Sequence, residues 1–160
     1  ITFRRSLSGR EEICSGIAML SDRVAVRLRR AGMKAAGVSL AIRDPDFRDI
    51  SRQRRLEPPT CLARELSQAA VSLAEGCWNM DSPVRALTVT ALYLISEDQA
   101  GVQLDLLGQA DAPRRDRLER LDRTLDQIRA KYGRNAISPA SSAGVCQGGV
   151  QEEDEEGATS

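Results

Sequence analysis

Residues 38–56 read VSLAIRDPDFRDISRQRRL and contain two extended segments around a short turn. The first, residues 38–43, alternates apolar and polar side chains strictly, which is typical of a half-buried β-strand. Asp44, Pro45 and Asp46 favour a turn. The second segment, residues 50–56, is also extended, and the pair Pro58-Pro59 is expected to close it. The stretch therefore predicts two consecutive strands joined by a turn.

An amphipathic helix is predicted on each side of this pair of strands. Upstream, residues 8–11 (SGRE) resemble a capping box, and Gly32 is expected to end the helix. Downstream, Thr60 is expected to cap the second helix. The apolar residues recur at three- and four-residue spacing, as Ile13, Ile17, Leu20, Val24 and Leu28 in the first helix and as Leu62, Leu66, Ala69, Leu73 and Cys77 in the second.

Two further extended runs complete the domain, a short one at Thr2-Phe3 and a longer one over residues 84–94. The order is then β-α-β-β-α-β, the split βαβ arrangement of the α+β class. We expect residues 1–95 to form a four-stranded sheet with both helices on one face. The other face would be open, and a function would lie there.

Three segments follow this predicted domain. Residues 96–112 read as a polar linker. Residues 113–137 predict a helix that begins at Pro113, ends at Gly133 and carries Leu118, Leu121, Leu125, Ile128 and Tyr132. Packing on the domain and contact with a partner are equally good interpretations of that helix. Residues 138–160 are small, polar and finally acidic, and we expect a disordered tail.

The net charge of zero hides an uneven distribution. Residues 138–160 hold five acids and no base, which leaves 18 acids against 23 bases in residues 1–137, or about +5. Arg supplies 21 of the bases and Lys two, at Lys34 and Lys131. Arg suits bidentate phosphate contacts, although a GC-rich genome would give the same bias without functional meaning.

The cysteines do not indicate a metal site. Cys14, Cys61, Cys77 and Cys146 are far apart, and the chain has no histidine. We expect reduced thiols in a cytoplasmic protein, with no metal or other cofactor in this segment. No apolar run is long enough to span a bilayer, and the chain starts at Ile1, which suggests a fragment of something longer.

Strand parity predicts what the open face displays, because alternate side chains point to opposite sides of a sheet. The outward residues are Thr2, Arg4, Ser39, Ala41, Arg43, Ser51, Gln53, Arg55, Ala86, Thr88 and Thr90. None is aromatic, which disfavours stacking of single-stranded bases. Hydroxyls and arginines suit phosphate oxygens, while an ordinary solvated face is the alternative. Arg52 and Arg54 have the opposite parity, but long side chains near an edge can swing round.

The chain resembles a known family in the helix end VRLRRAGMK (residues 26–34), the strand VSLAIR (38–43), the segment DFRDISRQR (46–54) and the strand PVRALTV (83–89). In order and spacing these resemble the little finger (polymerase-associated) domain of Y-family DNA polymerases, most closely the bacterial DNA polymerase IV type. The resemblance covers about residues 1–95. It implies that the open face lies along the template-primer duplex and grips backbone phosphates.

Carried over residue by residue, the resemblance implies DNA contacts for Ser51, Arg52, Gln53 and Arg54, with Arg55 from parity, and then for Arg4, Arg43 and Arg85. The chain departs from the family in two places. Its first strand is cut short, and Ala35, Ala36 and Gly37 stand where the family often has Arg or Lys.

The linker contains a further motif. Gln103, Leu104, Asp105, Leu106 and Leu107 resemble the clamp-binding pentapeptide of bacterial polymerases, with Leu107 in place of the usual aromatic residue. The amide and the apolar side chains suit an anchor and a hydrophobic cleft. An extra strand over residues 102–106 is the alternative. The motif often ends the chain in this family, so the predicted helix and tail after it are a departure.

These observations favour the DNA-binding and clamp-recruiting part of a lesion-bypass polymerase, acting in DNA repair or damage tolerance. The expected partners are duplex DNA and the sliding clamp, and the expected state is a monomer. No catalytic residue is identified, because the family's carboxylates and magnesium ions belong to a palm domain that this sequence lacks. The alternatives are a non-catalytic clamp-binding adaptor on the same frame and, less favoured, a stand-alone duplex-binding module.

Overall fold

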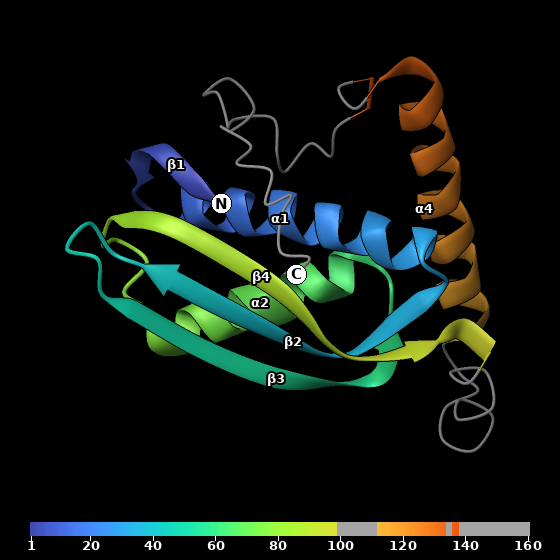
Figure 1. The fold of residues 1–160 in the computed structure, drawn as a ribbon, viewed down its shortest axis with the longest axis horizontal. Coiled ribbons are helices and arrows are strands. Elements are labelled where there is room, and N and C mark those ends of the chain that lie inside the picture. The colour runs from blue at the N-terminus through green and yellow to red at the C-terminus, as the bar shows by residue number, and fades with distance from the viewer. Residues whose placement is uncertain (99–111, 134–135, 138–160) are drawn as a thin grey trace, which may run out of the picture.

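The computed structural model describes residues 1–98, 112–133 and 136–137 (Figure 1). The elements are β1 (Thr2–Leu7), α1 (Arg10–Arg30), β2 (Met33–Arg43), β3 (Asp49–Thr60), α2 (Ala63–Cys77), β4 (Val84–Ser96) and α4 (Ala112–Tyr132). The four strands form one antiparallel sheet in the order β1-β4-β2-β3. The predicted α+β class and β-α-β-β-α-β order are confirmed.

The core lies between the sheet and the two helices α1 and α2, which pack against each other. The helix α1 also lies against β2 and β4, and α2 lies against β2 and β3. Its largest fully buried side chains are aliphatic: Ile13 and Ile17 from α1, Leu66 from α2, Leu40 and Ile42 from β2 and Leu87 from β4. Burial of each such side chain stabilises the fold by about 1.5–3 kcal/mol. Burial of these apolar side chains, which the periodicity of each helix and strand points inward, is therefore the main source of stability.

The strand β3 is longer than predicted. It continues through Pro58 and Pro59 to Thr60, and its pairing with β2 shifts between Arg55, opposite Gly37, and Thr60, opposite Ala35. The proline pair therefore lies in an irregular stretch of an edge strand. Proline is tolerated there because one side of the strand needs no ladder hydrogen bonds. The strand β1 is also longer than predicted and runs to Leu7.

Both predicted helix caps are wrong in detail. Gly9 precedes α1 with φ 85°, and the side chain that reaches back is Glu12 rather than Glu11: its carboxylate accepts a hydrogen bond from the Ser8 amide at 3.0 Å. The residue before α2 is Leu62, and Thr60 instead accepts the Leu62 amide with its hydroxyl at 3.0 Å. Spacing alone did not distinguish these neighbouring positions.

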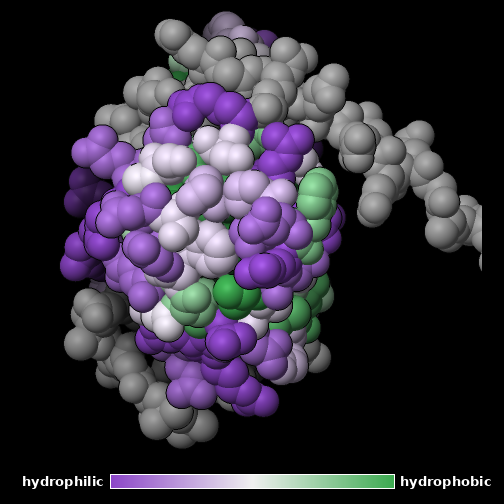
Figure 2. All heavy atoms as spheres, turned by 90° about the vertical axis from the view of Figure 1, so that its left-hand side faces the viewer, coloured by the Kyte–Doolittle hydropathy of each residue, from purple (hydrophilic) through white to green (hydrophobic). Residues whose placement is uncertain are grey.

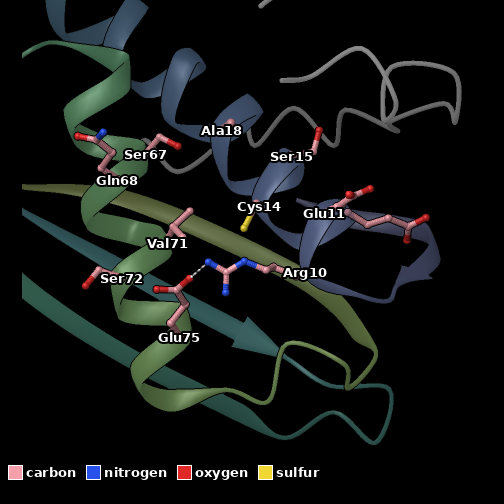
Figure 3. Close-up of a pocket in the computed structure, with 11 residues that line it drawn as sticks. Arg10, Glu11, Cys14, Ser15, Ala18, Ser67, Gln68, Val71, Ser72 and Glu75 are labelled. Atoms are coloured by element: carbon pink, nitrogen blue, oxygen red, sulfur yellow. Dashed lines mark ion pairs between the residues drawn. The ribbon is translucent and has the colours of Figure 1, made fainter. Parts of the chain in front are cut away.

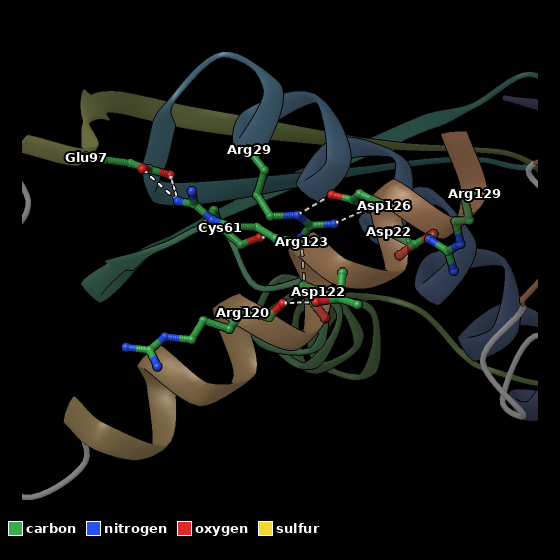
Figure 4. A network of polar contacts seen from close by, with 10 residues as sticks. Asp22, Arg29, Cys61, Glu97, Arg120, Asp122, Arg123, Asp126 and Arg129 are labelled. Carbon is green, nitrogen blue, oxygen red and sulfur yellow. Dashed lines mark hydrogen bonds and ion pairs between the residues drawn. The ribbon is translucent and has the colours of Figure 1, made fainter. Parts of the chain in front are cut away.

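The helix α4 packs across the ends of α1, α2 and the sheet, so the packing interpretation holds (Figures 1 and 4). Its centre is Arg29 of α1, whose side chain is only 4% exposed. The Arg29 guanidinium donates to Asp126 at 2.7 and 2.9 Å, to Asp122 at 3.0 Å and to the Cys61 carbonyl at 3.0 Å. A charge buried so completely needs these partners.

Further ion pairs extend this contact along α4. They are Lys34 with Glu119 at 2.7 Å, Arg115 with Glu65 at 2.8 Å, Arg123 with Glu97 at 2.8 Å and Arg129 with Asp22 at 2.7 Å. Asp122 also accepts the amide of Ala63, the first residue of α2. A carboxylate from α4 therefore caps α2 in place of a side chain from its own sequence.

Burial and pairing oppose each other in this cluster. Burial raises the pKa of Asp122, while the charge of Arg29 and the hydrogen bond from Ala63 lower it only in part. For Arg29, burial disfavours the charged form, but the hydrogen bond and charge of Asp126 and the charge of Asp122 leave its pKa raised. The contact of α4 with α1 and α2 therefore depends on Arg29, Asp122 and Asp126 together, because each charge is stabilised by the others.

Candidate nucleic-acid interface

The open face, defined as the side of the sheet opposite α1 and α2, carries rows of mostly polar side chains across three strands. Gln53, Ser39 and Thr90 are cross-strand neighbours on β3, β2 and β4. The next row is Ser51, Ala41 and Thr88. Neighbouring strands lie about 4.8 Å apart, so the rows form a shallow, closely spaced polar surface. The parity prediction is confirmed at these positions.

The arginines of β3 lie on both sides of the sheet edge. Arg55 is exposed on the open face, opposite Gly37. Arg52 and Arg54 are opposite Leu40 and Val38, which point to the helices, yet both are exposed because β3 is the edge strand. The Arg52 guanidinium donates to the Ser51 carbonyl at 2.9 Å. Within the described part of the chain, none of the three arginines forms an ion pair with a carboxylate, so their charge is not neutralised in that way.

Three other predicted contact residues are less simply placed. The Arg43 guanidinium donates to both oxygens of Asp49, its cross-strand neighbour, at 2.7 and 2.8 Å. This hydrogen bond and the charge of Asp49 raise the pKa of Arg43, and the same hydrogen bond lowers the pKa of Asp49. Arg85 is half-buried and already engaged in an interaction. Arg4 belongs to β1, but its side chain lies outside the described part of the structure.

The prediction that the open face has no aromatic side chain is wrong. Tyr93 of β4 has φ 52° and is 53% exposed. The Arg55 guanidinium lies over its ring, 5.2 Å from the centroid, and the ring edge lies against Gly37. Strand parity would point Tyr93 toward the helices, and the left-handed backbone reverses that direction. The alternation of side chains could not predict the position of Tyr93, because nothing in the surrounding sequence indicates the reversal.

A groove lies between α1 and α2 on the helical side, with a volume of about 840 Å³ (Figure 3). Its walls are mostly small or polar, and an ion pair between Arg10 of α1 and Glu75 of α2 crosses it. Cys14 faces the groove, and burial raises the pKa of its thiol, which makes it less nucleophilic. We find no arrangement here that favours catalysis.

The residues that the structure describes contain no cluster of histidine, cysteine, aspartate or glutamate that could hold a metal ion. None of the described helices has an apolar stretch that could span a lipid bilayer. The end of the molecule away from α4 shows mainly hydrophilic side chains with small hydrophobic patches between them (Figure 2). The predicted clamp motif, residues 103–107, and the tail over 138–160 lie outside the described residues.

Residues 1–106 match the family model described as the impB/mucB/samB family C-terminal domain. The chain belongs to this family. The match confirms the Y-family resemblance seen in the sequence, and it covers all four strands and both helices of the core.

Curated relatives agree with this family. The chain is similar to DNA polymerase IV of Acetivibrio thermocellus, with 32% identity over 133 residues, or 83% of this chain and 33% of the relative. It is 34% identical to DNA polymerase IV of Pelotomaculum thermopropionicum, over 89% of this chain and 34% of the relative. For the Moorella thermoacetica DNA polymerase IV the identity is 34%, over 93% and 36%.

Two facts follow from these alignments. The chain spans about a third of the length of the curated relatives it matches. An alignment of 83% or more of 160 residues also extends past the end of α4 at Tyr132. These relatives therefore have sequence aligned with α4, so the segment after the linker is not a departure from them.

Proposed function

We propose that this chain is the DNA-gripping and clamp-recruiting C-terminal part of a lesion-bypass DNA polymerase of the DNA polymerase IV type. The open face contacts the backbone of template-primer duplex DNA. The family membership supports the class of parent protein, and the curated relatives are named DNA polymerase IV. Nucleotidyl transfer, with its magnesium ions, would be carried out by a palm domain of the parent protein.

The single observation that carries the DNA-binding part is the chemistry of β3 and its neighbours. Arg52, Arg54 and Arg55 lie along an exposed edge strand beside rows of serine, threonine and glutamine side chains. Phosphate oxygens accept hydrogen bonds from all of these groups, and such contacts fix position without reading sequence. An enzyme that copies any template needs a grip of this kind.

Salt dependence tests this grip. Arg52→Ala with Arg54→Ala should weaken binding to a duplex oligonucleotide and flatten the plot of log affinity against log salt concentration. Each lost phosphate contact reduces the slope by about 0.9, so the double variant should lose roughly 1.8. The measurement is fluorescence anisotropy over a series of salt concentrations.

A matched control removes two exposed arginines from the helical side, Arg27 of α1 and Arg64 of α2. The Arg27→Ala and Arg64→Ala double variant has the same change in net charge but should keep the wild-type slope. Equal salt slopes for the β3 variant and the wild-type chain would show that Arg52 and Arg54 do not contact DNA phosphates.

The clamp-recruiting part rests on the sequence motif at residues 103–107 and its place between β4, which ends at Ser96, and α4, which begins at Ala112. Replacing Gln103, Leu106 and Leu107 with Ala should abolish capture of the chain by immobilised bacterial sliding clamp. A variant with Asp105→Ala alone is the control, because the resemblance leaves that position unspecified. Full capture of the triple variant would show that residues 103–107 are not needed for clamp binding and act only as a linker.

A further inference from the structure

The open face contains one feature that phosphate binding does not use, the ring of Tyr93. A bulky residue with φ 52° is rare, because the left-handed region crowds its Cβ. Such strain is found mostly where the surrounding structure holds a side chain in place for a function. Here the strained backbone brings an aromatic ring to the open face instead of into the core.

Gly37 makes room for this ring. A Cβ atom added to Gly37 would lie 2.8 Å from Tyr93 Cδ2 and 3.2 Å from Cε2, closer than side chains pack. Val38, the next residue of β2, points to the core, so Gly37 faces the open side of the sheet. Gly37 is nevertheless buried. The ring therefore rests on the sheet itself and is held above backbone rather than above another side chain.

Arg55 completes the site. It is the cross-strand neighbour of Gly37, and its guanidinium lies over the Tyr93 ring at 5.2 Å from the centroid. An aromatic ring and a guanidinium plane are the two protein groups on which unpaired nucleobases stack. Here the guanidinium lies over the ring at an exposed position, one cross-strand row beyond Gln53 and Ser39.

We propose that Tyr93 and Arg55 form a stacking platform for an unpaired nucleobase. The proposal rests on the proposed function, since the platform continues the surface that binds duplex backbone. A duplex lying on the polar rows would place its single-stranded extension on Tyr93, and the chain would prefer a duplex with an overhang over a blunt duplex. The base is recognised by its π face, so no base sequence is preferred.

The main test compares a blunt duplex with the same duplex carrying a short single-stranded extension. The wild-type chain should bind the extended duplex about tenfold more tightly, in the range that one stacked base provides. Tyr93→Leu should remove this preference while affinity for the blunt duplex stays unchanged. Tyr93→Phe keeps the ring and should keep the preference.

The outcomes separate this proposal from the grip on phosphates. Arg52→Ala with Arg54→Ala should weaken both substrates equally and leave the preference intact. Equal binding of both substrates by the wild-type chain overturns the platform but leaves the grip standing. A Tyr93→Leu variant that loses affinity for both substrates by the same factor also overturns it, because the ring would then only support the sheet.

A direct readout does not depend on duplex binding. Trp78 is the only tryptophan, so a Trp78→Phe and Tyr93→Trp double variant would report fluorescence from position 93 alone. A single-stranded oligonucleotide should quench this fluorescence by stacking on the indole, and the Trp78→Phe variant serves as the blank and as the check of folding by circular dichroism. Absence of quenching at oligonucleotide concentrations that saturate the anisotropy signal would rule out stacking, whatever the duplex results. If neither duplex binds, the proposed function fails and the quenching experiment alone decides the platform.

Discussion

Cys61 is a buried thiol whose acidity is strongly changed by its surroundings. Its side chain is fully buried between the end of β3 and α2, and its carbonyl accepts a hydrogen bond from Arg29 beneath α4. Burial, with smaller contributions from Glu119 and Glu97, raises the pKa of its thiol to about 11. Because the thiolate is the reactive form, Cys61 should be inert toward alkylating reagents in the folded chain at pH 8.

The raised pKa also predicts how stability depends on pH. An unfolded cysteine loses its proton near pH 8.5–9, whereas folded Cys61 keeps it until about pH 11. Between these values the unfolded state binds fewer protons, so the free energy of unfolding falls as pH rises, by about 3 kcal/mol in total. Urea unfolding at pH 8 and pH 10.5 measures the fall. Cys61→Ala should lack this component, and an equal fall in both proteins would assign it to other groups.

At the residue scale, the sequence predicted the face of the sheet on which a side chain lies wherever the strands alternate regularly. Ser51, Gln53 and Arg55 are on the expected face because β2, β3 and β4 keep a two-residue period there. Tyr93 was not predictable, since one left-handed residue reverses the parity of a side chain without leaving a sequence signal. The ion pair of Arg43 with Asp49 depends on the cross-strand register of β2 and β3. The sequence did not define that register, because the predicted ends of the two strands were approximate.

At the scale of elements, the docking of α4 depends on charge rather than on apolar burial. Leu121 and Tyr132 of this helix remain largely exposed, while Asp122, Asp126 and Glu119 turn toward basic residues of the domain. An apolar stripe at helical spacing predicted the helix itself. It predicted the docked face only in part, since Leu118, Leu125 and Ile128 are half-buried there. The ion pairs could not be predicted, because the pairing of acids with Arg29 and Lys34 requires the fold to bring distant segments together.

Asp126→Asn tests this docking. It leaves the buried Arg29 guanidinium without its strongest partner, which should lower the free energy of unfolding by about 3 kcal/mol. Urea unfolding measures the loss. Asp49→Asn is the matched control, because it removes an acid from the exposed pair with Arg43 and should have no measurable effect. Similar losses in both variants would contradict a buried ionic contact.

The order of elements was accessible from the sequence because each helix and strand has its own hydrophobic period. The boundaries were less accessible. The strand β3 passes through Pro58 and Pro59 because an edge position removes the usual penalty, and edge position is a property of the whole sheet. The cap of α2 comes from Asp122, on an element far along the chain, so no local pattern could have identified it.

At the scale of the whole molecule, the sheet and the α4 contact are separate surfaces. The open face and the arginines of β3 lie on the sheet, whereas α4 contacts α1, α2 and the strand ends through Arg29, Glu65, Lys34 and Glu97. Stability and DNA binding should therefore respond differently to loss of α4. The α4 sequence is also aligned in the curated relatives, which agrees with a role in the structure of the domain.

A chain ended after residue 111 tests this separation. Removal of α4 exposes Arg29, uncaps α2 at Ala63 and removes Glu119 from the surroundings of Cys61. The expected result is a lower free energy of unfolding and faster alkylation of Cys61, measured in a background where the other cysteines are serine. Duplex affinity and its salt slope should stay at the wild-type values under conditions where circular dichroism shows a folded sheet. A shortened chain that stays folded but loses duplex binding would instead place the DNA contact on α4, whose exposed arginines include Arg114, Arg117 and Arg120.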